Sequence, residues 1–249
     1  MKSLSTKDLP TFLQKKINQT YHPIASPLKH AEFYAKNSQS PILDIGFGLG
    51  YVAAASINLY IRNNKPIELA CIEKDKQIIK KVSSINIREL EPGHSIIKQA
   101  LKNHNQYNKG RIKITIITGD ARKAVKRLNK KFSTIFLDGF SPNKNPELYT
   151  LEFLELLKTK LNNDGIILCH SQNPIFRTAL KQLNFKIGNL EQGTIAGLSQ
   201  NFSLEEKDEK LLKAFRPFRD PKLNWSKEKI LKEWDKLPMI TDTKPLKRN

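Results

Sequence analysis

Short apolar segments alternate with amphipathic segments over most of the chain. The apolar runs are rich in Ile and Leu and lack strict alternation, which predicts strands buried on both faces. Asn162-Asn163-Asp164-Gly165 predicts a turn into the fifth strand. The repeated strand–helix unit predicts an α/β fold with a doubly wound, Rossmann-like, mostly parallel seven-stranded sheet. The expected strands are 41–45, 67–72, 112–118, 134–137, 165–170, 185–190 and 194–198, and the expected helices are 52–63, 76–89, 121–128, 148–161 and 174–182.

Both ends of the chain depart from this pattern. Residues 1–40 are expected to form an N-terminal lead-in, with Pro23 and Pro27 breaking its helices, that packs on a catalytic domain over 41–202. From 203 to 249 the pattern changes to charged helical turns and proline-containing linkers. This C-terminal extension is expected to pack partly on the domain through its aromatic residues Phe215, Phe218, Trp225 and Trp234.

Neither a membrane segment nor an export signal is evident in the sequence. No run reaches the ~18 apolar residues that a membrane helix needs, and the N-terminus lacks the apolar core of a signal peptide. We therefore expect a cytoplasmic protein with no membrane partner. Cys71 and Cys169 fall in expected strands that are not neighbours, so we expect two buried thiols rather than a disulfide.

A glycine-rich turn after the first expected strand is the most specific chemical signal. Asp44 lies two residues before Gly46-Phe47-Gly48-Leu49-Gly50, and a helical segment follows. This order is typical of a strand, a turn that a ligand can approach closely, and a helix N-terminus. A dinucleotide fingerprint needs its third glycine three residues after the second, where Tyr51 stands here. The compact form favours S-adenosylmethionine (SAM), which has no pyrophosphate, although a plain strand-to-helix turn would have the same pattern.

Three acidic residues lie at successive strand ends, where ligands bind in open α/β sheets. Glu73 suits the two ribose hydroxyls of the cofactor, and Asp120 suits the adenine amino group or a helix N-cap. Asp138 closes the fourth strand. Any one of them is an ordinary turn residue, but together after the glycine turn they indicate a SAM pocket. The expected cofactor-binding residues are Asp44, Gly46, Gly48, Gly50, Glu73, Asp120, Ala121 and Asp138.

The charge of the chain points to a polyanionic partner. The sequence has 43 Lys and Arg against 24 Asp and Glu, a net charge of +19, which favours nucleic acid over an acidic membrane surface. From Lys98 to Lys131 there are 11 basic residues and one acid. Four cations on the helix over 121–128 are expected to face solvent, either as phosphate contacts or as a plain solvated face. They are Arg122, Lys123, Lys126 and Arg127.

Histidines in this basic region do not suggest a metal site. The spacing of His94 and His104 does not suit metal ligands, and we expect both to be surface residues.

The segment Leu137-Asp138-Gly139-Phe140-Ser141-Pro142-Asn143-Lys144-Asn145-Pro146-Glu147-Leu148-Tyr149-Thr150 resembles the signature loop of the methyltransferase domain of the MnmC family. The glycine turn is similar to the family's glycine loop, with Leu49 in place of its usual threonine. Gly193–Ala196 is similar to its late strand, and Tyr21-His22 to the start of its N-terminal motif. The resemblance covers roughly residues 20–200. It departs from the family at Pro23 and the stretch that follows, and at Tyr149, where a tryptophan is usual.

The resemblance implies a class I SAM-dependent methyltransferase. Members convert 5-aminomethyl-(2-thio)uridine to 5-methylaminomethyl-(2-thio)uridine at the tRNA wobble position. Asp138 would orient the substrate amine first and take up its proton second. We expect a stand-alone monomeric form that lacks the family's FAD oxidoreductase domain, with tRNA as its partner. The substrate contacts so implied are Tyr21, Phe140, Pro142 and Lys144, besides the four cations.

Other functions remain open at this point. The same cofactor residues would serve a methyltransferase acting on a protein or small-molecule amine. Aminopropyl transfer uses a related fold, but a net charge of +19 would repel a polycation. A non-catalytic SAM- or RNA-binding subunit is the third class, and the intact set of glycines and strand-end acids argues against it.

Overall fold

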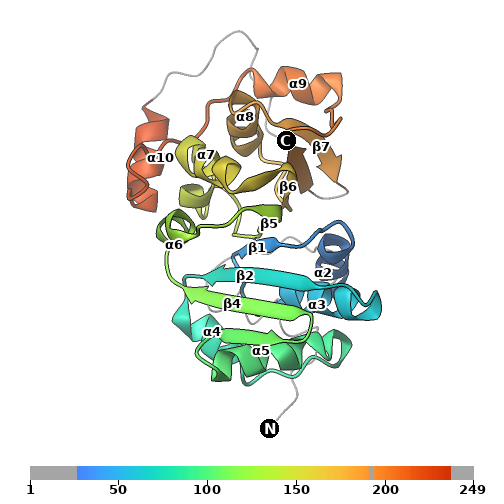
Figure 1. The fold of residues 1–249 in the computed structure, drawn as a ribbon. Coiled ribbons are helices and arrows are strands. Elements are labelled where there is room, and N and C mark those ends of the chain that lie inside the picture. The colour runs from blue at the N-terminus through green and yellow to red at the C-terminus, as the bar shows by residue number, and fades with distance from the viewer. Residues whose placement is uncertain (1–26, 191–192, 237–249) are drawn as a thin grey trace. The chain divides into compact units, whose positions relative to one another are not determined.

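The computed structural model describes residues 27–190 and 193–236. The chain divides into two compact units, Met1–Asp120 and Ala121–Asn249 (Figure 1). The predicted substrate residue Tyr21 and most of the expected lead-in lie outside the described residues. The expected division into a lead-in, a domain and an extension stays a prediction.

The first unit is built on three parallel strands, β1 (Ile42–Ile45), β2 (Ile67–Glu73) and β4 (Ile112–Thr118). A short strand, β3 (Gln106–Lys109), pairs antiparallel with β4, so the strand order is β3-β4-β2-β1. The register sets Ile45 opposite Ile72 and Glu73 opposite Thr118. The carboxyl ends of the three parallel strands therefore coincide at one edge, as the sequence predicts.

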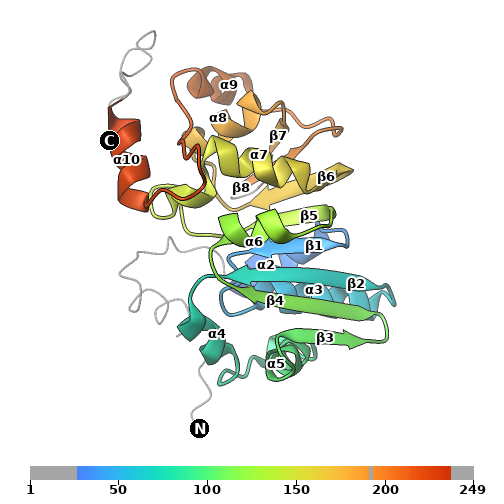
Figure 2. The same cartoon turned by 60° about the vertical axis from the view of Figure 1, so that its left-hand side comes forward.

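The described part of the first unit, from residue 27 on, also has five helical segments: α2 (Pro27–Lys36), α3 (Tyr51–Arg62), α4 (Lys76–Val82), the short 3₁₀ helix η1 (Arg88–Leu90) and α5 (Gly93–Lys102). Helix α3 is buried along most of its length and packs on α2, while α5 lies beside β3 (Figure 2). Pro27 was expected to break a helix but begins α2, because the first turn of a helix has no intrahelical acceptor for its N–H.

The sequence predicted one long helix over 76–89, and this was wrong. Helix α4 ends at Val82, and the pattern missed α5 entirely. Pro92 stands at the N-cap of α5 and separates the two helices, since a proline cannot sit inside a helix without removing a hydrogen bond.

The second unit pairs β5 (Phe132–Leu137) in parallel with β6 (Leu161–Cys169). Strand β8 (Gly193–Gly197) runs antiparallel to β6, and β7 (Lys186–Leu190) antiparallel to β8, giving the order β5-β6-β8-β7. The predicted α/β class with mostly parallel strands is confirmed. The described residues hold eight strands rather than the seven expected, and the additional one is β3. Its four residues carry no apolar run that would have marked it.

The turn expected at Asn162–Gly165 is instead a bulge inside β6. Between two paired positions, β5 advances from Phe132 to Thr134 while β6 advances from Leu161 to Ile166. The extra residues of β6 are the ones with turn-forming character. A Cβ on Gly165 would lie 2.9 Å from the carbonyl oxygen of Phe132, so glycine allows the two chains to approach here.

The helices of the second unit are α6 (Ala121–Arg127), the 3₁₀ helix η2 (Pro146–Leu148), α7 (Leu151–Thr159), α8 (Pro174–Gln182), α9 (Glu206–Leu212) and α10 (Lys227–Asp235). Helix α10 packs on η2. Phe218 is 1% exposed, its ring centroid lies 5.7 Å from that of Trp234, and its carbonyl accepts a hydrogen bond from Leu151. Two aromatic residues of the extension therefore pack on each other, and the expectation that its aromatic side chains pack on the domain stays a prediction.

Two further expectations concern the cysteines and the membrane. Cys71 and Cys169 are free and buried, as predicted. Burial raises the pKa of Cys169 to about 12, so this thiol stays protonated near neutral pH. Within the described parts of the chain, no helix combines the length and the apolar character that crossing a bilayer would require.

Candidate functional site

The glycine loop after β1 has a backbone that other residues rarely adopt. Gly46, Gly48 and Gly50 all have positive φ, at 92°, 57° and 80°. A Cβ on Gly50 would in addition lie 2.9 Å from the ring of Phe47. The N–H of Gly46 donates to the carbonyl of Ile72 at 3.0 Å, which fixes the loop to β2. Because these positions carry no side chains, a ligand can approach the main chain closely.

Glu73 clamps this loop from the end of β2. Its Oε2 accepts a hydrogen bond from the N–H of Gly48 at 2.9 Å, and its Oε1 accepts one from Asp75 at 2.8 Å. Each carboxylate oxygen can accept two hydrogen bonds, so the half-buried carboxylate retains capacity for hydroxyl donors. The same side chain therefore shapes the loop and can bind a diol.

Asp120 follows the end of β4 beside Glu73. The N–H of Gly119 donates to the main-chain carbonyl of Glu73 at 2.8 Å, which joins the ends of β4 and β2. Asp120 is partly exposed, and Ala121, next in the chain, is 7% exposed and begins α6. The first unit thus brings the glycine loop, Glu73 and Asp120 to one edge.

Asp44 lies one residue before the end of β1 and is 1% exposed. It is in register with Cys71 of β2. Burial first, and the charge of Asp44 second, raise the pKa of the Cys71 thiol well above its usual value. A contact between Asp44 and a cofactor stays a prediction.

His94 was expected on the surface, and the structure corrects this. The side chain is 0% exposed and lies on α5, which packs against the glycine loop through Ile97, 3.3 Å from the Cβ position of Gly50. Sequence reasoning placed His94 in a loop because it missed α5, on which positions 94, 97 and 100 share the buried face. Burial, aided by the charge of Lys98, lowers the pKa of His94. His104 is exposed, as predicted.

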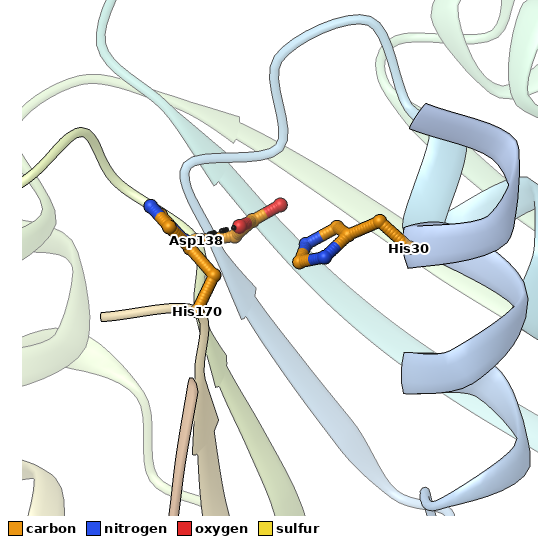
Figure 3. Close-up of side chains that lie close together, drawn as sticks. All are labelled: His30, Asp138 and His170. Atoms are coloured by element: carbon orange, nitrogen blue, oxygen red, sulfur yellow. Dashed lines mark hydrogen bonds and ion pairs between the residues drawn. The ribbon is translucent and has the colours of Figure 1, made fainter. Parts of the chain in front are cut away.

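In the second unit, Asp138 forms a pair that the sequence did not reveal. Asp138 follows β5 and His170 follows β6, and the parallel register of Phe136 with Leu168 sets the two strand ends side by side. Nδ1 of His170 lies 3.0 Å from Oδ1 of Asp138 (Figure 3). The two side chains are 21% and 20% exposed, so both remain open to solvent. The available signal was that His170 follows the strand neighbouring that of Asp138.

The loop after Asp138 is folded on itself. The N–H of Phe140 donates to Oδ1 of Asn145 at 3.1 Å, and the N–H of Lys144 donates to the carbonyl of Ser141 at 2.7 Å. Phe140 and Lys144 are partly exposed, whereas Pro142 is buried. Of the predicted substrate residues in this loop, Phe140 and Lys144 therefore present surface to a ligand and Pro142 supports the fold of the loop.

Tyr149 supports the loop from the core rather than lining it. Its side chain is 0% exposed, and its ring packs edge-on against Phe176 at 5.3 Å. Its hydroxyl donates to the carbonyl of Gly139 at 3.3 Å, directly after Asp138. Burial raises the pKa of Tyr149 well above its usual value, so the phenol is neutral near neutral pH.

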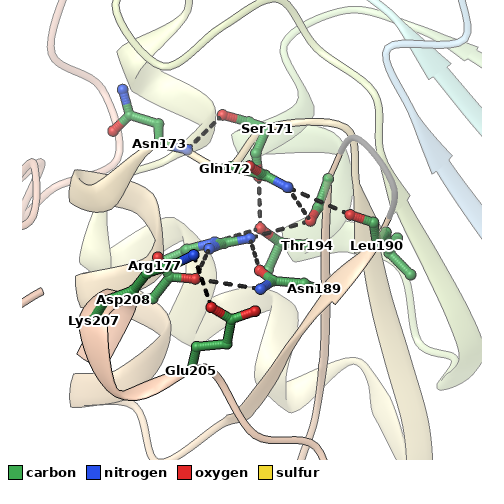
Figure 4. A network of polar contacts seen from close by, with 11 residues as sticks. Ser171, Gln172, Asn173, Arg177, Asn189, Leu190, Thr194, Glu205, Lys207 and Asp208 are labelled. Atoms are coloured by element: carbon green, nitrogen blue, oxygen red, sulfur yellow. Dashed lines mark hydrogen bonds and ion pairs between the residues drawn. The ribbon is translucent and has the colours of Figure 1, made fainter. Parts of the chain in front are cut away.

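A buried arginine holds the chain that follows His170 (Figure 4). Arg177 of α8 is 4% exposed, and its Nε donates to Oγ1 of Thr194 at 2.9 Å. That hydroxyl in turn donates to the carbonyl of Ser171 at 2.6 Å. Arg177 also donates to Asn189 at 2.8 Å. The network thereby ties α8 and the β7–β8 hairpin to the residue next to His170.

The basic helix α6 presents three cations instead of the four expected. Lys123, Lys126 and Arg127 are exposed, but Arg122 is 6% exposed. Its guanidinium donates to Asp220 at 2.7 Å and to the carbonyl of Trp225 at 2.8 Å. The helical pattern could not reveal this, because Asp220 and Trp225 come from a distant segment that covers the side of α6 assigned to solvent.

Comparison with known proteins gives consistent matches. A family model described as S-adenosyl-L-methionine-dependent methyltransferase matches residues 91–195. The crystal structure of MnmC2 from Aquifex aeolicus is 32% identical, with a TM-score of 0.66, and the match covers 84% of this chain and 70% of that one.

Two relatives from sequence comparison add to this. An uncharacterized protein of Methanocaldococcus jannaschii is 27% identical over 252 residues, covering 93% of this chain and 68% of its own length. The tRNA 5-methylaminomethyl-2-thiouridine biosynthesis bifunctional protein MnmC of Leptospira borgpetersenii is 32% identical over 134 residues, or 49% of this chain. That match spans 21% of the bifunctional protein.

Proposed function

The chain belongs to the MnmC2 family of SAM-dependent methyltransferases, and from this premise we propose that it methylates a tRNA wobble uridine. The reaction converts 5-aminomethyl-(2-thio)uridine to 5-methylaminomethyl-(2-thio)uridine. The observation that supports this substrate best is the partly exposed Asp138 carboxylate, which begins a segment whose sequence resembles the signature loop of the MnmC family. The protein would act as a monomer in the cytoplasm, where its tRNA is found.

The residues at the edge of the first unit fit SAM. The main chain of Gly46, Gly48 and Gly50 is open to close approach, Glu73 has hydrogen-bonding capacity left for ribose hydroxyls, and Asp120 is partly exposed for the adenine amino group. When bound, SAM supplies an electrophilic methyl group on a cationic sulfur. Asp44, Ala121 and Asp138 complete the proposed cofactor set.

Asp138 would orient the amine that is methylated. A carboxylate accepts hydrogen bonds from the amine N–H groups and so fixes the direction of the nitrogen lone pair. Phe140 would pack against the uracil ring, with Pro142 holding the loop, and Lys144 would meet a nearby phosphate. Much of the rate enhancement in this proposal comes from positioning.

The exposed cations of α6 would bind the tRNA backbone. Lys123, Lys126 and Arg127 lie on one short helix with exposed side chains, and the chain carries a net charge of +19. Contacts of this kind position a nucleic acid without reading its bases and weaken with added salt. Arg122 is left out of this set because its charge is engaged with Asp220.

The test is mass spectrometry of wobble nucleosides. The purified chain is incubated with SAM and with tRNA that carries the unmethylated aminomethyl group, and a matched sample omits SAM. We expect 5-methylaminomethyl-(2-thio)uridine in the complete reaction alone. SAM binding by calorimetry without any methylated nucleoside would favour another amine substrate. Absence of SAM binding would favour a non-catalytic subunit.

A further inference from the structure

The geometry points to His170 as the group that accepts a proton from the substrate ammonium, with Asp138 holding its ring in place. The inference rests on the proposed function and deepens it. His170 is not among the residues that sequence reasoning assigned to the site. The role of His170 is inferred from the hydrogen bond between its Nδ1 and Oδ1 of Asp138, at 3.0 Å (Figure 3).

The chemistry of an aliphatic amine creates the need for such a group. The amine is largely protonated near neutral pH, and only the neutral form has a lone pair for attack. A carboxylate alone is a poor solution, because its negative charge stabilises the ammonium form that must be removed. A neutral imidazole beside that carboxylate supplies a basic nitrogen that can take the proton, and the carboxylate then stabilises the imidazolium that forms.

The hydrogen bond assigns the two ring nitrogens. When Nδ1 carries a proton and donates it to Asp138, the lone pair of the neutral imidazole is on Nε2, at the other side of the ring. In the step proposed, an N–H bond of the substrate ammonium breaks and its electron pair stays on the amine nitrogen. A new N–H bond forms at Nε2, and the Asp138 carboxylate stabilises the imidazolium. The proton later passes to water.

Two neighbouring side chains of the second unit, Tyr149 and Cys169, do not compete with His170 for this proton. Burial raises the pKa values of Tyr149 and Cys169, so both are neutral near neutral pH and neither takes the proton. Glu147 adds negative charge near Tyr149, and Arg177 adds positive charge near Cys169. Among these groups of the second unit, Asp138 is the carboxylate that is hydrogen-bonded to His170.

The main chain around His170 is held by contacts on both sides. The N–H of Ser171 donates to the sulfur of Cys169 at 3.4 Å, and the carbonyl of Ser171 accepts from Thr194 at 2.6 Å. Thr194 is itself held by the buried Arg177 (Figure 4). The ring is therefore pre-positioned, as a proton acceptor must be.

The first experiment needs neither cofactor nor substrate. The ring nitrogen that carries the proton in each neutral histidine is identified by ¹⁵N NMR, and the signal of His170 among the five histidines is assigned by its loss in His170→Gln. We expect the proton of His170 on Nδ1 in the unaltered protein, because this nitrogen lies 3.0 Å from Oδ1 of Asp138, and a shift of the proton toward Nε2 in Asp138→Ala. A proton on Nε2 of His170 in the unaltered protein would overturn the inference.

The second experiment measures single-turnover methylation of tRNA against pH. In the unaltered protein the rate should change little with pH over a range in which the amine is protonated, because the complex holds its own proton acceptor. In His170→Gln and His170→Asn the rate should fall about tenfold for each unit by which the pH is lowered in this range, and by about 10²- to 10⁴-fold at neutral pH. His104→Gln, an exposed histidine, serves as the matched control.

The outcomes separate this inference from the proposed function. If the unaltered protein methylates no tRNA, the proposed function fails. If it does, and both folded His170 variants keep the level profile, His170 is not the acceptor. Calorimetry of SAM binding and circular dichroism establish that the fold of each variant is intact. If one His170 variant loses both SAM binding and the folded spectrum, the conclusion is drawn from the other His170 variant.

Discussion

Arg122 and Asp220 form a buried ion pair that connects α6 to the C-terminal extension. Nη1 of Arg122 lies 2.7 Å from Oδ2 of Asp220, and the two side chains are 8% and 0% exposed. The other oxygen of Asp220 accepts hydrogen bonds from the main chain of Asn224 and Trp225, at 3.0 and 3.1 Å. The pair thus organises the turn that leads to α10.

Removal of one partner should destabilise the protein strongly. We expect Asp220→Asn or Arg122→Met to lower the free energy of unfolding by about 3–5 kcal/mol, because the remaining charge stays buried without compensation. The double variant should lose less than the sum of the single ones. Urea unfolding measures this. Unchanged stability together with weaker tRNA binding would instead indicate that Arg122 contacts the tRNA.

The exposed cations of the same helix should behave differently. Lys126→Glu with Arg127→Glu should raise the Michaelis constant for tRNA and reduce its dependence on salt, since fewer counterions are released. Stability should hardly change, because both side chains are exposed. Lys186→Glu with Lys213→Glu is the matched control, because it reverses two exposed charges away from α6. Equal effects of both changes would indicate only the loss of net charge.

The edge of the first unit was predictable because it depends on local sequence and strand order. The apolar run before the glycines, the acid at the end of β2 and Asp120 after β4 are brought together by parallel pairing alone. Arg122 was misplaced because its partner lies 98 residues away in the sequence. Helical periodicity shows which positions face inward on average, and it carries no information on a segment that covers the outer face.

The Asp138–His170 pair lies between these two cases. Asp138 was found from its place at a strand end, and the same rule applied to β6 would have indicated His170. A histidine after an apolar run is common, so its type alone gave no signal. Only the register, in which the ends of β5 and β6 coincide, reveals that the two side chains meet.

Glu73 should be essential for cofactor affinity. In Glu73→Gln one of the two carboxylate oxygens is replaced by an NH₂ group, which is a donor. The side chain can then no longer accept the hydrogen bonds of both Gly48 and Asp75 through separate oxygens. We expect SAM to bind about ten- to a hundredfold more weakly in calorimetry, as for the loss of a hydrogen bond to a charged group. Glu68→Gln, at the other end of β2, should leave the affinity unchanged. Equal losses in both variants would point to the strand rather than the carboxylate.

Asp138 should matter for turnover more than for cofactor binding. We expect Asp138→Ala to abolish methylation of tRNA while SAM affinity falls only slightly, because the residue orients the amine. Rapid-quench measurement of the chemical step, together with calorimetry, separates the two effects. Glu155→Ala, an exposed acid on α7, is the control. Near-normal turnover of Asp138→Ala would remove its role even if the substrate is correct.

The buried His94 should make the stability of the protein depend on mild acid. Burial lowers its pKa in the folded state, so above the unfolded value of about 6.5 the ring is neutral in both states and costs nothing. Below that value the unfolded chain binds a proton at His94 more readily than the folded protein does. The free energy of unfolding should therefore decrease as the pH falls below about 6.5. Urea unfolding at several pH values should show a smaller decrease in His94→Gln than in the unaltered protein. His104→Gln should show the same decrease as the unaltered protein. The same decrease in all three proteins would assign it to other groups.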